Sequence, residues 1–172
     1  MQKIYKIKKN KINFFYLKPF KDKRGEFYEV YNKKLFNKKI KNIVFVEDDL
    51  SISKKNVFRG FHSDKKAWKL LTCIHGKVIF YFLNFMEFKK TKISIIKKKV
   101  SDNSIYSFLI PPNIGVAYFT ISKKAIISYK QSEYYDIKRQ DTISINDNKI
   151  KKIIRHKNII ISKRDKKSDI NI

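Results

Sequence analysis

The sequence predicts an all-β domain, and two observations lead to this expectation. Helical periodicity is nearly absent, whereas short runs rich in β-branched and aromatic residues recur along the 172 residues. Turn-forming groups separate many of these runs, among them Asp22-Lys23-Arg24-Gly25, His75-Gly76 and Pro111-Pro112-Asn113. Many strands at close spacing are typical of a β-sandwich or barrel, and a jelly roll of this kind encloses a cavity that suits a small molecule.

The expected elements follow in chain order. Strands are predicted at 12–17 and 26–31, followed by the one expected helix at 32–40, with Leu35, Phe36 and Ile40 on its apolar side. Further strands are predicted at 43–50, 57–61, 70–74, 78–85, 92–97, 105–110, 117–121, 125–131 and 142–145. Because no repeat or linker divides the chain, we expect a single domain over 1–172, with a core at about 12–165 and a basic tail at 166–172.

Composition narrows the class of protein. Aromatic residues make up 15% and hydrophobic residues 42% of the chain, which is enough to build a core. The longest apolar run, 78–83, is far shorter than the roughly 18 residues of a membrane span, and the first residues show no signal-peptide pattern. The single cysteine, Cys73, excludes an internal disulfide and suits a reducing compartment. We therefore expect a cytoplasmic protein with no membrane partner.

The formal net charge of +26 would suit a nucleic-acid partner. The excess is lysine, spread in short groups, and it accompanies abundant Ile, Asn, Phe and Tyr, which share A/T-rich codons. A biased genome therefore explains the charge, and we expect no nucleic-acid partner. A basic nucleic-acid-binding β-domain stays open as an alternative, although its aromatic residues lack the ordered stacking motif of such modules.

The residues that carry chemistry exclude several kinds of site. The histidines His62, His75 and His156 form no His-x-His pair, so we expect no metal. No Gly-x-Ser-x-Gly elbow is present, Cys73 lies in an apolar stretch, and four scattered glycines build no phosphate loop. Proton transfer by His, Tyr, Lys and carboxylates remains. Taken singly, His62 is better explained as a structural core histidine.

Short motifs follow one another in a fixed order. They are Asp22-x-Arg24-Gly25-x-Phe27-x-Glu29, Glu47-Asp48-Asp49-x-Ser51, Arg59-Gly60-x-His62, Lys69-Leu70-x-x-Cys73-x-x-Gly76, Tyr129-Lys130-x-x-x-Tyr134-Tyr135 and Ser162-x-x-Asp165. Each motif is weak alone. In this order and spacing, over about residues 14–165, the chain resembles the dTDP-4-dehydrorhamnose 3,5-epimerases, which carry F-x-D-x-R-G-x-F-x-E, F-V-Q-D-N-x-S, V-L-R-G-L-H, K-L-V-x-C-x-x-G, Y-K-x-x-x-Y-Y and S-x-x-D.

The resemblance implies a cupin-like jelly roll with a few short helices. It also implies a cofactor-free isomerase that removes a proton beside a ketone and returns one to the opposite face. It makes His62 the base and Asp165 the group that holds it, with Tyr129 as the opposite-face acid and Lys69 as the cation beside the oxyanion. The substrate-binding residues that it implies are Arg59 at the pyrophosphate, together with Arg24, Phe27, Glu29, Glu47, Asp49 and Tyr135. A homodimer with exchanged N-terminal strands would carry Arg24 and Glu29 into the neighbouring subunit's site.

Two departures from the family pattern bear on the substrate. The family's P-x-G-F-A-H-G-F segment has a second histidine where Val116 stands, and the aspartate that commonly pairs with it falls on Phe80. Losing both together leaves no orphaned buried charge, so the pocket fits an unusual 4-keto sugar or inversion of a single carbon. The loop at 63–68 is short, which is more similar to the GDP-linked 4-keto-heptose epimerases of capsule pathways.

The expected function is inversion of C3 and/or C5 of a nucleotide-diphospho-4-keto-6-deoxy sugar for surface polysaccharide. One alternative is a GDP-4-keto-heptose epimerase, with inversion of a single carbon as a variant. A non-catalytic protein that binds sugar nucleotides is the alternative from another class.

Overall fold

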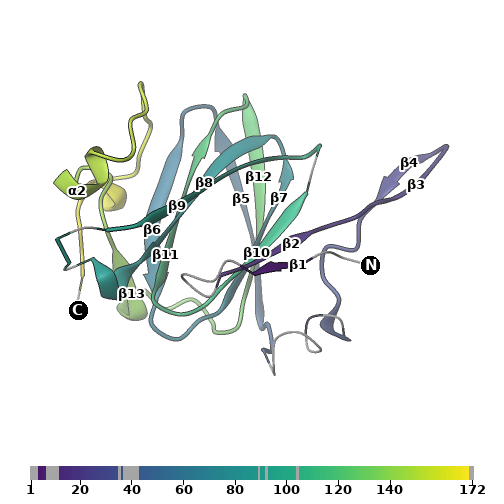
Figure 1. The fold of residues 1–172 in the computed structure, drawn as a ribbon, viewed down its shortest axis with the longest axis horizontal. Coiled ribbons are helices and arrows are strands. Elements are labelled where there is room, and N and C mark those ends of the chain that lie inside the picture. Colours follow the sequence, from purple (N-terminus) through teal and green to yellow (C-terminus); the bar gives the residue numbers. More distant parts are fainter. Residues whose placement is uncertain are drawn as a thin grey trace.

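The computed structural model describes residues 4–6, 12–34, 36, 43–88, 90–91, 93–103 and 105–170. Within these residues, two antiparallel sheets face each other (Figure 1). One sheet has the strand order β1 (Ile4–Lys6), β2 (Asn13–Tyr16), β10 (Tyr106–Ile110), β7 (Lys69–His75), β12 (Lys124–Gln131) and β5 (Glu47–Lys54). The other has the order β13 (Gln140–Thr142), β6 (Phe58–Asp64), β11 (Ile114–Thr120), β8 (Lys77–Asn84) and β9 (Ile95–Ser101). The predicted all-β jelly roll is confirmed.

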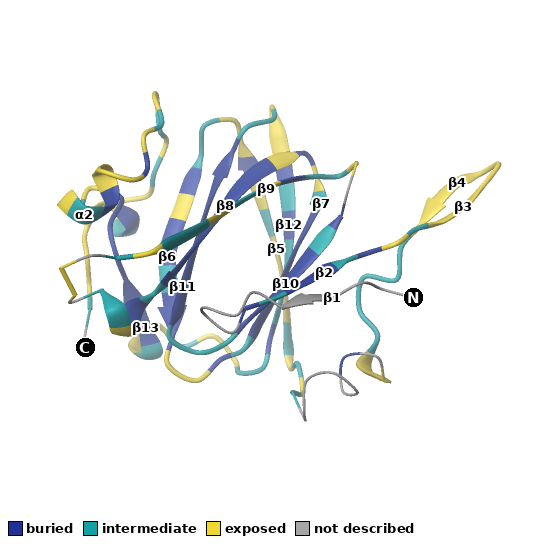
Figure 2. Cartoon of the chain, viewed as in Figure 1, coloured by how far each residue is buried: buried dark blue, intermediate teal, exposed yellow. Residues whose placement is uncertain are grey.

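Shorter elements lie outside the two sheets. A hairpin of β3 (Phe20–Asp22) and β4 (Gly25–Phe27) projects from the body, and its residues are exposed (Figure 2). Besides the helical residues 33, 34 and 36, the described ranges contain η1 (Phe85–Glu87), η2 (Ile137–Arg139), α2 (Asn148–Lys151) and η3 (Arg164–Lys166). No helix among the described residues has the length and apolar character needed to cross a membrane.

The core lies between the sheets and extends beyond both of them. Phe14, Leu71 and Phe108 from one sheet meet Phe80 and Phe82 from the other in a fully or nearly fully buried cluster. A second apolar cluster covers the far face of β6, β8 and β11 with side chains of the C-terminal segment. As a result β11 is buried along its whole length (Figure 2). The C-terminal segment is thereby held against β6, which places it beside the pocket.

Several predicted strands have different bounds in the structure. The strand expected at 26–31 ends at Phe27, and the one expected at 43–50 begins at Glu47. Their remaining apolar residues, such as Tyr31 and Phe45, instead pack against the outer face of the six-stranded sheet as irregular chain. An apolar run that covers a sheet has the same composition as a strand, which explains the error.

Three other predictions also change. The strand expected at 92–97 begins at Ile95 and runs to Ser101, and the one expected at 142–145 is the end of a strand at 140–142. Residues 143–145 leave the sheet because Ile143 and Ile145 enter the second apolar cluster. Of the helix expected at 32–40, residues 33, 34 and 36 are helical, and 35 and 37–40 lie outside the described residues.

Candidate active site

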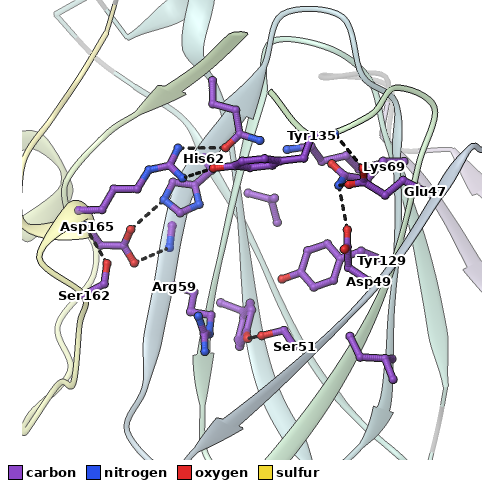
Figure 3. A pocket seen from close by; sticks show the side chains of 17 residues that line it. Glu47, Asp49, Ser51, Arg59, His62, Lys69, Tyr129, Tyr135, Ser162 and Asp165 are labelled. Carbon is purple, nitrogen blue, oxygen red and sulfur yellow. Dashed lines mark hydrogen bonds and ion pairs between the residues drawn. The ribbon is translucent and has the colours of Figure 1, made fainter. Parts of the chain in front are cut away.

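A pocket of about 400 Å³ lies between the two sheets, next to the C-terminal segment (Figure 3). Eight of the residues predicted for the site line it: Glu47, Asp49, Arg59, His62, Lys69, Tyr129, Tyr135 and Asp165. They come from β5, β6, β7, β12, the segment after β12, and η3. Side chains separated by more than 100 positions are therefore brought to one cavity.

A bulge in β6 places both Arg59 and His62 on the pocket side. Successive residues of a regular strand face opposite sides, so these two side chains, three positions apart, would point in opposite directions. His62 pairs with Val116 and Arg59 pairs with Tyr118, which puts three steps of β6 against two steps of β11. Gly60 lies within the bulge with φ +105°, and a Cβ there would be 2.4 Å from the Val116 carbonyl oxygen. The Arg-Gly-x-His spacing therefore requires glycine at this position.

The side chain of His62 is fixed by Asp165. His62 Nε2 lies 2.8 Å from Asp165 Oδ1, and the second carboxylate oxygen accepts the backbone N–H of Gly60 at 3.4 Å. Asp165 is 3% exposed, whereas the His62 side chain retains 26% of its exposure and opens into the pocket. Hydrogen bonds from Asp165 N to Ser162 Oγ and from Ser144 Oγ to Asp165 O anchor the η3 turn. The pair is therefore hydrogen-bonded on its buried side and accessible on the other.

Tyr129 and Lys69 line the pocket from the six-stranded sheet. Tyr129 is paired with Leu71 and Gln131 with Lys69, so the alternation of β7 and β12 directs Tyr129 and Lys69 to the same face. Burial raises the pKa of Tyr129 well above its usual value, and the neighbouring Tyr118 raises it further. The hydroxyl therefore stays protonated at neutral pH.

Lys69 is a buried cation, 7% exposed. Burial lowers its pKa to about 8, while the negative charge of Asp64 opposes that shift and the positive charge of Arg164 adds to it. No hydrogen bond or ion pair connects its ammonium group to the described part of the chain. Lys69 thus presents unneutralised donors to the pocket.

Two arginines border the pocket at the side of β6 and η3. Arg59 Nε donates to Ser53 Oγ at 3.0 Å, and Ser53 Oγ lies 2.8 Å from the Tyr118 hydroxyl. Arg164 donates to the Tyr135 hydroxyl at 3.1 Å and to Gln140 Oε1 at 2.9 Å. Both guanidinium groups are therefore oriented by neutral oxygen atoms, and neither is ion-paired with a carboxylate of the described residues.

The other predicted binding residues, Arg24, Phe27 and Glu29, do not line this pocket. Arg24 and Phe27 belong to the projecting hairpin, where Arg24 is ion-paired with Asp22 and Phe27 is 69% exposed. Glu29 accepts a hydrogen bond from Asn32 at 2.8 Å. Within one chain, these three residues and the pocket are separate.

The two apolar positions noted in the sequence occupy different places. Val116, 7% exposed, lines the pocket beside its strand partner His62. Phe80 is fully buried behind the wall, in ring contact with Phe82, Phe108 and Tyr118. Neither position therefore provides an ionisable side chain.

Some pocket residues were missed in the sequence. Tyr118, Gln131 and Arg164 line the cavity but belong to none of the predicted sets. Strand alternation would have found the first two, because they lie two positions after Val116 and Tyr129. Arg164 is one of few arginines in the chain and precedes Asp165 directly.

Among the described residues, no group of three or more His, Cys, Asp or Glu side chains is arranged to hold a metal ion.

Comparison with known proteins supports the resemblance seen in the motifs. The family model described as dTDP-4-dehydrorhamnose 3,5-epimerase matches residues 8–170. The protein of that name from Salmonella typhimurium is 31% identical over 137 residues, which cover 77% of this chain and 75% of that one.

Solved structures agree with the sequence comparison. A crystal structure of the dTDP-4-dehydrorhamnose 3,5-epimerase from Elizabethkingia anophelis superposes with a TM-score of 0.81 at 28% identity, covering 96% of this chain and 93% of that one. The structure from Bacillus anthracis, with TDP and PPi bound, reaches a TM-score of 0.88 at 22% identity over 99% of both chains, which shows the shared fold. The chain belongs to the dTDP-4-dehydrorhamnose 3,5-epimerase family and is an isomerase.

Proposed function

We propose that this enzyme inverts C3 and/or C5 of a dTDP-linked 4-keto-6-deoxy sugar. The observation that supports it best is the His62–Asp165 pair on one sheet, with Tyr129 and the buried Lys69 on the other. Inversion beside a ketone needs a base on one face of the sugar ring, an acid on the other, and a positive group beside the oxygen. The pocket supplies these three parts.

His62 is the base in this proposal. Because Nε2 donates to Asp165, the lone pair available to accept a carbon-bound proton is on Nδ1, which is the ring nitrogen left for the pocket. Asp165 stabilises the imidazolium that forms, as the aspartate of a catalytic triad does. The C–H electrons move onto the ketone oxygen and give an enolate.

Lys69 stabilises that enolate and Tyr129 completes the inversion. With a pKa of about 8, Lys69 is mostly cationic at neutral pH and can donate to the developing oxyanion. Tyr129 stays protonated because its pKa is raised, and it delivers a proton to the carbon from the side opposite His62. Protonation at carbon re-forms the C=O bond of the ketone and leaves that carbon with inverted configuration.

The nucleotide diphosphate is assigned to the arginine side of the pocket. The fork of Arg59 suits paired phosphate oxygens, and Arg164 adds a second guanidinium at the same border. We assign Tyr135, Arg24, Phe27 and Glu29 to the nucleoside. The hairpin that carries Arg24 and Phe27 projects from the two sheets (Figure 1). Arg24, Phe27 and the nearby Glu29 would therefore act in the partner of a homodimer with exchanged N-terminal strands.

Val116 favours a second candidate for the substrate. An apolar side chain at the pocket surface beside His62 provides no further acid or base, which suits inversion of a single carbon or a different sugar. A GDP-linked 4-keto-heptose, as expected from the short loop at 63–68, is the specific alternative. In either case we place the reaction in the cytoplasm, in the supply of sugars for surface polysaccharide.

The test is solvent proton exchange. The protein is incubated in deuterated water with dTDP- and GDP-linked 4-keto sugars, and mass spectrometry and NMR report the mass gain and the labelled carbons. His62→Ala should abolish exchange while its affinity for dTDP stays within about twofold, because the imidazole faces the sugar. Exchange at the wild-type rate in His62→Ala would refute the assignment, and deuterium at both C3 and C5 would exclude the single-carbon version.

A further inference from the structure

The side chain of Tyr118 connects the two sheets at the pocket. It extends from β11 of the five-stranded sheet and is 1% exposed, and its hydroxyl lies 2.7 Å from Ser51 Oγ and 2.8 Å from Ser53 Oγ on β5 of the six-stranded sheet. Arg59 Nε donates to Ser53 Oγ at 3.0 Å. Because a guanidinium nitrogen only donates, Ser53 can pass its own hydrogen to Tyr118, which in turn can donate to Ser51. These hydrogen bonds hold the Tyr118 side chain in one orientation between the sheets.

The connection lies close to both groups assigned to proton transfer. On the five-stranded sheet, Tyr118 is two positions from the residue that pairs with the base His62. On the six-stranded sheet, Ser51 is two positions from the residue that pairs with the acid Tyr129, and both of these side chains line the pocket (Figure 3). Residues two apart on a strand face the same side. The connection therefore joins the wall that carries the base to the wall that carries the acid.

Tyr129 packs against the same group of side chains as Tyr118. Tyr118 belongs to the buried cluster between the sheets, and Tyr129 packs against that cluster as a partly buried side chain. Burial raises the pKa of Tyr129 and the nearby Tyr118 raises it further, as expected when two hydroxyl groups are close together. In the family segment P-x-G-F-A-H-G-F, phenylalanine stands at the position of Tyr118. A phenylalanine ring would fill the same space without connecting the sheets.

We propose that Tyr118 is a positioning residue for the acid of the proposed reaction. Through its hydrogen bonds to Ser51 and Ser53 it sets the separation of the two pocket walls. It thereby holds Tyr129 against the face of the sugar opposite His62. The inference rests on the proposed function and adds to it the residue that determines which face of the carbon receives the proton.

Loss of the connection should affect the two proton transfers differently. His62 is held by Asp165 on its own side of the pocket, so it can still remove the substrate proton, exchange it for deuterium and return it to the same face. Tyr129 depends on the separation of the sheets, and a displacement of about 1 Å can slow a reaction step about 10²-fold. Deuterium would then enter the sugar while the configuration of the carbon is retained.

The experiment follows a dTDP-linked 4-keto-6-deoxy sugar in deuterated water with wild-type and Tyr118→Phe protein. Mass spectrometry gives the rate of deuterium incorporation, and NMR coupling constants of the sugar ring give the fraction with inverted configuration. For Tyr118→Phe we expect inversion to be about 10- to 100-fold slower, with deuterium incorporation within about threefold of the wild-type rate. The affinity for dTDP, measured by calorimetry, should be unchanged.

Tyr81→Phe is the matched control. Tyr81 lies on β8 of the same sheet and is 2% exposed, but it faces away from the pocket, with its hydroxyl 2.6 Å from His156 Nε2. This variant removes the same group from the same sheet and should leave the ratio of inversion to incorporation unchanged. Ser51→Ala should lower that ratio by a smaller factor than Tyr118→Phe, because Ser53 still holds the tyrosine.

Two results would overturn the inference. One is an unchanged ratio in Tyr118→Phe or, if that variant does not fold, in Ser51→Ala. The other is an equal loss of inversion and incorporation, which a general disturbance of the pocket would produce. Both results leave the proposed reaction intact. Absence of deuterium incorporation with the wild-type protein would instead refute the proposed reaction, and the positioning role with it.

Discussion

Replacing Asp165 by asparagine should remove most of the activity without disturbing the shape of the site. Asp165 accepts two hydrogen bonds, from His62 Nε2 at 2.8 Å and from the Gly60 N–H at 3.4 Å. An asparagine has one acceptor oxygen at its amide and can satisfy only one of these donors. If the oxygen remains on Gly60, the NH₂ group faces His62 Nε2 and forces that nitrogen to accept. The ring proton then moves to Nδ1, and the nitrogen that should take the substrate proton carries one already.

The expected loss is large. The corresponding change of a triad aspartate, which also leaves histidine in the wrong tautomer, lowers kcat by about 10⁴, and that factor corresponds to about 5.5 kcal/mol in the activation free energy. We expect a decrease of this order in the rate of deuterium incorporation into a dTDP-4-keto sugar.

The assay needs a fold control. Asp165 is 3% exposed and its backbone anchors the η3 turn, so the midpoint of thermal unfolding should be measured on the same samples. An Asp165→Asn variant that folds like the wild type and exchanges deuterium within about tenfold of its rate would refute the orientation argument.

Three further predictions follow from the same structure. Activity should fall as the pH rises through about 8, because Lys69 loses its proton there and the neutral amine no longer stabilises an enolate; a kcat/KM profile without a decline between pH 7 and 9.5 would contradict this. Gly60→Ala should lower the free energy of unfolding in urea by about 2–4 kcal/mol, because the added Cβ combines positive-φ strain with backbone overlap. Gly25→Ala is the control: its φ is also positive, but no atom lies within 4 Å of the added Cβ, so the loss should be about 1–2 kcal/mol. Equal losses for the two variants would contradict the close approach of Gly60 to β11. Mixing inactive Arg24→Ala and His62→Ala proteins should restore part of the exchange activity if the hairpin serves a partner's pocket, and absence of rescue would argue for sites contained within one chain.

The residues assigned to the reaction could be predicted because their spacing is preserved in short motifs. His62, Lys69, Tyr129 and Asp165 were each named from the sequence, and all four line one pocket. Composition and periodicity alone would not have selected them, since a histidine on a strand or a lysine among many has a structural explanation. The order and spacing of the motifs along the chain made it possible to predict these four residues.

Other features depend on backbone geometry that a residue pattern does not encode. Strand alternation would have placed Arg59 and His62 on opposite faces, and only the register shift against β11 brings them together. The two carboxylates that β5 contributes to the pocket could be predicted, because Glu47 and Asp49 are two positions apart on one strand. Gln131, whose amide nitrogen donates to both carboxylates, lies on a strand far along the chain and was not predicted as a pocket residue.

The pairing of His62 with Asp165 also determines the stage of chain synthesis at which the catalytic base can first be oriented. The two residues are 103 positions apart, so a growing chain makes the base long before the carboxylate that orients it. The strands of both sheets are complete by Thr142, whereas the dyad requires the η3 turn at Arg164–Lys166 to fold back onto β6. Synthesis of the last strand therefore precedes synthesis of the carboxylate that orients His62. A chain truncated before Ser162 would lack both Asp165, which orients the base, and Arg164, which borders the pocket.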